Sequence, residues 1–230
     1  MRTLTMRDRR LPVAASLLIV AGLLAPRLLA QSAQALTPEQ RAQFAAWWEQ
    51  QPTLNMPFDN NGAKVLIVEF TDLQCPHCRQ KYLEIKPILD KYAGRPKDVT
   101  LLLKHWPISP GCNPGVSTNV HPSACDAAAA VVMARRKGTA DALIDWFFTH
   151  QDEMTPATVR RAASEIGKIP DFDAQYARAI QEVKTDAALG SALGVNSTPS
   201  FFINARRLPG GGLAAQYFAA LLDLEVARVK

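Results

Sequence analysis

Two cysteines separated by two residues are the part of this 230-residue chain best suited to chemistry: Cys75-Pro76-His77-Cys78. The apolar run Val65–Phe70 just before them predicts a buried strand, and the residues after them predict a helix. Cys75 would then lie in the first helical turn, where free N–H groups and the helix dipole favour an anion and lower a thiol pKa. His77 can add a positive charge or a hydrogen bond to that sulfur. Cys78, one turn further along, can close a disulfide with Cys75.

Two other interpretations of the C-x-x-C motif remain open. One is a static disulfide. The other is half of a zinc site completed by Cys112, Cys125 and His121, although these residues form no second C-x-x-C. Because the motif sits on a predicted strand–helix–strand unit, we favour thiol–disulfide exchange.

Two further signals accompany the motif. Glu69, six residues before Cys75, could lie beneath the disulfide and accept or relay the proton of Cys78, or it could turn outward on the strand. Thr198-Pro199 precedes the strand-like run Ser200–Asn204, and a proline in such a turn can be cis.

Cys112 and Cys125 bracket a loop rich in proline, glycine, serine and asparagine. In an oxidising compartment we expect them to form a structural disulfide that closes this loop. The alternative is a relay pair that passes electrons to or from Cys75 and Cys78.

The N-terminus resembles an export signal. Basic residues precede the apolar run Leu11–Ala25, and small residues follow, which predicts a signal peptide over residues 1–35, cleaved after Ala30 or Ala35. The alternative is a membrane anchor formed by residues 11–30. Both interpretations place the rest of the chain in the periplasm or elsewhere outside the cytoplasm.

The net charge mostly belongs to this signal. The chain carries +5, and residues 1–35 hold five arginines and one aspartate, so the remainder carries only +1. No basic cluster interleaved with aromatic residues remains, so we expect no nucleic-acid partner. The rest divides into an N-terminal helix and linker, residues 36–62, and one domain, residues 63–230.

The segment VLIVEFTDLQCPHC, residues 65–78, resembles the DsbA-like branch of the thioredoxin superfamily. ALGVNSTPSFFIN, residues 192–204, is similar to the cis-proline segment of that family, and Lys86-Pro87 to its kinked first helix. The resemblance implies an α/β thioredoxin fold, with βαβ and ββα halves, a central mixed sheet and a helical insertion at residues 106–193.

The resemblance also implies roles for individual residues. Cys75 would be the nucleophile, Cys78 the resolving thiol, Glu69 the buried acid and Pro199 the cis-proline beside the bound substrate. Thr198 stands where the best-known oxidases have valine, so reduction or isomerisation of disulfides stays an alternative to oxidation.

These features predict an exported enzyme that donates a disulfide to reduced or misoxidised exported proteins. We expect a monomer that needs no metal, flavin or nucleotide. The segment CNPGVSTNVHPSAC, residues 112–125, also resembles thioredoxin-like domains associated with vitamin K epoxide reductase homologues. A DsbB-like or vitamin K epoxide reductase-like membrane protein would then reoxidise the cysteines. A non-catalytic thioredoxin-like binding module is the alternative from another class.

Overall fold

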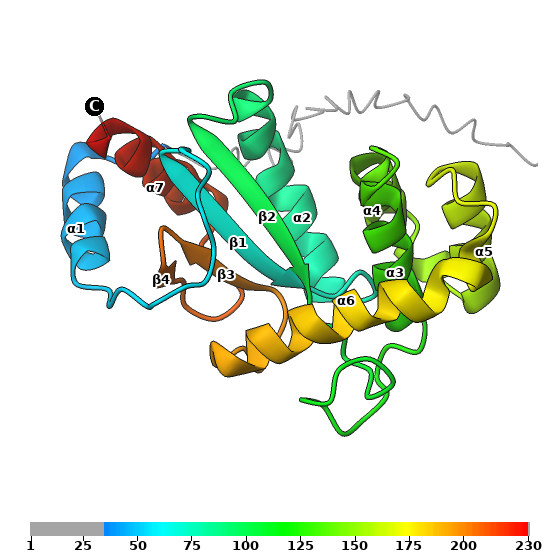
Figure 1. Cartoon of the computed structure of the whole chain (residues 1–230). Helices are drawn as coiled ribbons and strands as arrows, with labels where there is room; N and C mark the ends of the chain where they lie inside the picture. The colour runs from blue at the N-terminus through cyan, green and yellow to red at the C-terminus, as the bar shows by residue number, and fades with distance from the viewer. Residues whose placement is uncertain (1–34, 230) are drawn as a thin grey trace, which may run out of the picture. The chain divides into compact units, whose positions relative to one another are not determined.

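The computed structural model describes residues 35–229, in which seven α-helices surround one four-stranded sheet (Figure 1). The predicted signal peptide, and with it the alternative anchor at residues 11–30, lies outside the described residues apart from Ala35. The regular elements, in chain order, are α1 (Pro38–Glu49), β1 (Val65–Thr71), α2 (Pro76–Leu89), η1 (Asp90–Tyr92), β2 (Val99–His105), α3 (Ala124–Arg135), α4 (Ala140–Thr149), η2 (Gln151–Glu153), α5 (Pro156–Glu165), α6 (Phe172–Ala192), β3 (Ser200–Ile203), β4 (Arg206–Arg207) and α7 (Ala215–Arg228).

The sheet is mixed, with the strand order β2-β1-β3-β4. β1 pairs in parallel with β2 through the α2 crossover and antiparallel with β3, which forms a hairpin with β4. A βαβ half and a ββα half thus share one sheet, and four helices, α3 to α6, separate them in the chain. This arrangement confirms the predicted thioredoxin fold with a helical insertion.

Helices pack against both faces of the sheet. Val65 and Ile67 of β1 contact a buried cluster that includes Ile85 of α2 and Phe218 of α7. Phe70, on the opposite face, joins a second cluster with residues of α6. α6 approaches the sheet closely at Gly190, where an added Cβ would lie 2.9 Å from the Phe70 ring. Figure 1 shows α3, α4 and α5 gathered at one end of α6, away from α1 and α7.

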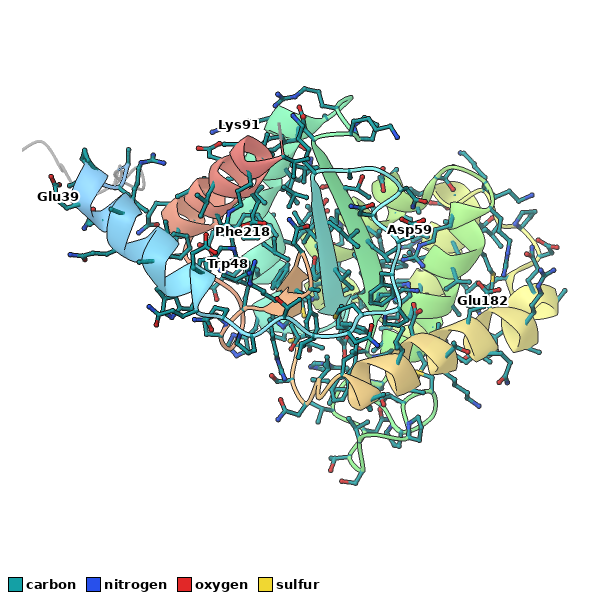
Figure 2. All side chains as sticks on the ribbon, turned by 60° about the vertical axis from the view of Figure 1, so that its left-hand side comes forward. Glu39, Trp48, Asp59, Lys91, Glu182 and Phe218 are labelled. Carbon is teal, nitrogen blue, oxygen red and sulfur yellow. A yellow bond between two sulfur atoms is a disulfide. The ribbon has the colours of Figure 1, made fainter. Side chains whose placement is uncertain are left out.

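The N-terminal helix packs onto the domain through one of its two tryptophans. Thr37 caps α1 in a capping box with Gln40, as the sequence predicts. Trp48 is fully buried, and its indole N–H donates to Glu225 Oε1 of α7 at 2.8 Å. Figure 2 shows Trp48 on α1 facing α7, on which Phe218 is labelled. Trp48 therefore anchors α1 to the domain, and Trp47, only partly buried, packs against the same cluster.

In residues 35–229, no helix is both long enough and apolar enough to cross a membrane.

The β3–β4 turn contains a strained alanine. Asn204 and Ala205 both have positive φ, 44° and 66°, in the hairpin turn between the two strands. Asparagine tolerates this region, and here its side chain also accepts from the Leu66 N–H at 2.9 Å. Alanine does not tolerate it, because its Cβ crowds the backbone carbonyl.

Ala205→Gly should therefore stabilise the protein by about 0.5–1 kcal/mol, after the greater unfolded-state freedom of glycine is allowed for. Urea unfolding followed by circular dichroism measures the change. Gly210→Ala, at a loop position with no positive φ and open space around it, is the matched control. An unchanged or lower midpoint for Ala205→Gly would contradict the assignment of strain.

Candidate active site

Cys75 is the N-cap residue of α2, and Pro76 begins the helix. This placement is one residue earlier than the first helical turn expected from the sequence. Pro76 suits the first position because its fixed φ fits a helix and its missing N–H would have had no partner there. Both cysteines are free thiols, 3% and 0% exposed for Cys75 and Cys78, while Pro76 and His77 between them are exposed. The motif thus lies at the surface with its sulfur atoms turned inward.

The two thiols differ strongly in acidity. A hydrogen bond from the Cys78 thiol is the main reason why the pKa of Cys75 falls to about 5; burial opposes it, and the backbone N–H groups of Cys78 and His77 assist. Burial first, and then the hydrogen bond and negative charge of Cys75, raise the pKa of Cys78 well above its usual value. Near neutral pH the reduced pair is therefore one thiolate, at Cys75, and one thiol, at Cys78.

The Thr198–Pro199 loop lies directly against Cys75. The peptide bond between these residues is cis, and the Thr198 carbonyl oxygen lies 3.7 Å from Cys75 Sγ. The buried Thr198 hydroxyl has no hydrogen-bond partner within the described residues. It lies near Cys75 and lowers the pKa of that thiol further. Residues separated by more than a hundred positions thus meet at one sulfur atom.

Glu69 turns inward from β1. It is only 3% exposed, and burial raises its pKa to about 7. Thr71, two residues along and therefore on the same face of the strand, is fully buried, and its hydroxyl lowers the pKa of both Glu69 and Cys78. The Thr71 hydroxyl itself has no hydrogen-bond partner among the described residues.

Cys112 and Cys125 form a disulfide with an S–S distance of 2.08 Å. Cys112 is fully buried, and Cys125 lies in the first turn of α3. This pairing excludes the alternative in which both would serve as zinc ligands with Cys75 and Cys78. Within residues 35–229, no group of three or more His, Cys, Asp or Glu side chains is arranged to hold a metal ion.

Several residues at the site were not identified from the sequence. Asp72, which belongs to none of the motifs described above, is buried directly after β1, with its carboxylate 2.7 Å from His121 Nδ1. Gln151, from η2, donates to the backbone carbonyls of Leu73 and Cys75 at 2.9 and 3.0 Å. Only the position of Asp72 at the end of β1 could have signalled this role.

His105, His121 and His150 belong to no partner pattern in the sequence, so surface positions or structural hydrogen bonds are expected for all three; this prediction is wrong for His105. Its side chain is fully buried on β2, opposite Thr71 in the strand register, and neither ring nitrogen has a hydrogen-bond partner among the described residues. Burial lowers its pKa well below the usual value, so the ring is neutral.

The fold is similar to several solved structures. α-DsbA1 of Wolbachia pipientis aligns with a TM-score of 0.60 and 20% identity, over 76% of this chain and 94% of that one. BdbD of Bacillus subtilis aligns with a TM-score of 0.58 and 18% identity, over 78% and 94%. A periplasmic thioredoxin-like protein of Salmonella enterica serovar Typhimurium aligns with a TM-score of 0.55 and 20% identity, over 84% and 99%.

This chain shares the fold of these structures, and its own cysteine pair lies at the head of α2. The chain belongs to the thioredoxin family, whose model, described as Thioredoxin, matches residues 58–221.

Curated relatives contain the same region within longer chains. The chain is 30% identical over 151 residues to the Na(+)/H(+) antiporter NhaA 3 of Salinispora tropica, which is 64% of this chain and 21% of that protein. It is 28% identical over 164 residues to the Na(+)/H(+) antiporter NhaA 1 of a Mycobacterium strain, 69% of this chain and 25% of that protein. The chain therefore spans about a quarter or less of the length of these relatives.

Proposed function

We propose that this protein is an exported thiol:disulfide oxidoreductase that donates the Cys75–Cys78 disulfide to substrate proteins. The observation that carries the proposal is the acidity difference within the pair, with the pKa of Cys75 at about 5 and that of Cys78 well above its usual value. A stabilised thiolate is a good leaving group, and it favours the reduced form of the enzyme, which makes the disulfide a stronger oxidant.

The lowered pKa of Cys75 stabilises the folded protein in its reduced form but not in its oxidised form. The pKa of Cys75 is lowered from 9.0 to about 5 on folding. Its anion therefore stabilises the folded reduced protein fully above the unfolded-state pKa near 9, and this contribution is lost as the pH falls through about 5. The oxidised protein has no such contribution, so reduction is favoured across the neutral range.

The proposed reaction conserves electrons and protons in two exchange steps. A substrate thiolate attacks Cys75 Sγ, the bond to Cys78 Sγ breaks, and Cys78 leaves and takes up a proton. A second substrate thiolate then attacks the substrate sulfur of the mixed disulfide and releases Cys75 as a thiolate. The substrate loses two electrons and two protons; the enzyme gains both electrons and one proton, and the other proton passes to water.

The remaining site residues take supporting roles in this proposal. Glu69, with its pKa at about 7, exchanges the proton of Cys78 through its shared neighbour Thr71. The Thr198–Pro199 loop aligns the substrate chain, because its carbonyl group faces the attacked sulfur at 3.7 Å. His77 and Pro76 are exposed and contact the substrate beside Cys75.

We further propose that the protein works outside the cytoplasm. The basic and apolar N-terminal sequence supports export, and the described Salmonella protein of similar fold is periplasmic. A separate membrane protein of the DsbB or vitamin K epoxide reductase type would reoxidise the pair. Antiport is the activity named for the longer relatives and is not proposed for this chain.

Two measurements test the direction of the reaction. The ultraviolet absorbance of the thiolate, titrated in the reduced protein, should give a midpoint near pH 5, as the pKa of Cys75 indicates. Equilibration with glutathione should give the Cys75–Cys78 pair a reduction potential of about −120 mV, as expected of an oxidant. A value near about −270 mV would favour a reductase instead. A midpoint near pH 9 with no glutathione exchange would favour a non-catalytic binding module.

A further inference from the structure

The strap between β1 and α2, residues 72–75, contacts both reactive cysteines through the backbone of Asp72. The Asp72 N–H donates to Cys78 Sγ at 3.4 Å, and the Asp72 carbonyl accepts from the Cys75 N–H at 3.1 Å. Asp72 is 1% exposed and thus carries a buried carboxylate three residues before Cys75. Its position and its charge both bear on the thiolate that forms when the disulfide is reduced.

The Asp72 carboxylate is held by three donors. The Gln74 N–H donates to Oδ1 at 2.7 Å, and the Ile108 N–H donates to Oδ2 at 2.6 Å. His121 Nδ1 lies 2.7 Å from the same Oδ2, and its side chain is 12% exposed. Two of the three donors thus come from the loop between β2 and α3, which the Cys112–Cys125 disulfide closes.

His121 is the only side chain among the donors to Asp72 in residues 35–229 that can carry a positive charge. Two backbone N–H groups can orient the carboxylate but cannot neutralise it. A protonated imidazole does neutralise it, so the pair presents no net charge to Cys75. With a neutral imidazole, the strap would hold an uncompensated negative charge beside a thiolate, which opposes formation of that thiolate.

We infer that Asp72 and His121 form a positioning pair whose balanced charge stabilises the Cys75 thiolate and so strengthens the Cys75–Cys78 disulfide as an oxidant. The inference rests on the proposed function, and it concerns what sets the reduction potential of the Cys75–Cys78 pair. In the balanced exchange with glutathione, the protein disulfide and two glutathione thiols give the protein dithiol and one glutathione disulfide. Asp72 and His121 stabilise only the reduced protein in this equilibrium, because only the reduced protein has the Cys75 thiolate.

The electrostatics of the two groups agree with this geometry. The pKa of His121 is raised, first by the hydrogen bond to Asp72, against the effect of burial, and then by the negative charges of Asp72 and Cys75. Because coupling between two charges is reciprocal, an imidazolium that the thiolate stabilises must in turn stabilise the thiolate.

Other ionisable groups near the sulfur atoms do not share this contact. Within the described part of the chain, none of these groups hydrogen-bonds to the Asp72 carboxylate. The variants described below replace none of them. On β1, β2 and the first turn of α2 they are Glu69, His77, Arg79 and His105.

The test compares His121→Gln, which keeps a neutral hydrogen-bond donor, with His121→Lys, which keeps a positive charge. The equilibrium constant for reduction by glutathione is measured at about pH 6, where a histidine of raised pKa is charged. We expect His121→Gln to lower this constant about fivefold, and His121→Lys to stay within about twofold of the parent.

Lys104→Gln is the matched control, because it removes a cation from another buried carboxylate, Asp186, at 2.8 Å, with no contact to the strap. It should lower stability and leave the glutathione constant unchanged. The inference is overturned if His121→Gln matches the parent, if His121→Lys shifts as far as His121→Gln, or if Lys104→Gln shifts equally. A parent protein that does not exchange with glutathione at all would instead overturn the proposed function, and the inference with it.

Discussion

Cys75→Ser is expected to abolish oxidation of a reduced dithiol peptide, because the variant can neither form the disulfide nor offer the sulfur that substrates attack. The serine hydroxyl remains protonated where the Cys75 thiol, with its pKa at about 5, is ionised. Relative to the reduced parent, the variant should also lose the stabilisation that the Cys75 thiolate supplies to the folded protein near neutral pH. The measurement is the rate of peptide oxidation by the oxidised protein in the absence of another oxidant.

Cys78→Ser is the matched control that separates the two roles. It retains the Cys75 thiol but removes the one that resolves a mixed disulfide. Incubated with glutathione disulfide, it should accumulate one glutathione adduct per chain, seen by mass spectrometry, whereas Cys75→Ser should accumulate almost none because Cys78 is fully buried. Equal adduct formation by both variants would contradict the assignment of Cys75 as the attacked sulfur.

Removal of the second disulfide by Cys112→Ala/Cys125→Ala is expected to lower the free energy of unfolding by about 3 kcal/mol while turnover is largely retained. The two cysteines lie 13 positions apart, and a closed loop of this size restricts the unfolded chain by roughly that amount. Denaturant unfolding of the oxidised variant and parent measures the loss, and peptide oxidation at a temperature where both are folded measures turnover.

The opposite result would identify a relay pair. A relay requires thiol attack on the second disulfide, so its removal would stop turnover. If the double variant lost turnover with an unchanged unfolding midpoint, the two cysteines would pass electrons to or from Cys75 and Cys78. Ala205→Gly, which acts at a distant turn, can be combined with the double variant to restore part of its stability without touching either disulfide.

Local sequence was sufficient to predict the reactive pair and its scaffold. A buried strand followed at once by Cys-Pro-His-Cys places a thiol at a helix start, and both features depend on interactions within a few residues. The start of α1 also follows from a local signal, the capping box of Thr37 and Gln40. The mixed sheet followed from the family resemblance of residues 65–78 and 192–204 rather than from periodicity alone.

The sequence by itself determined which atoms react, because thiol chemistry depends on residue type and on the adjacent helix start. Only the tertiary structure decided what surrounds them. Thr198 reaches Cys75 from 123 positions away, and His121 reaches Asp72 from 49 positions away. Such contacts depend on how β3 pairs with β1 and on where the disulfide closes the loop after β2, and no local pattern specifies either. Likewise, the burial of Glu69 and His105 depends on the helices that cover β1 and β2 rather than on their own strands.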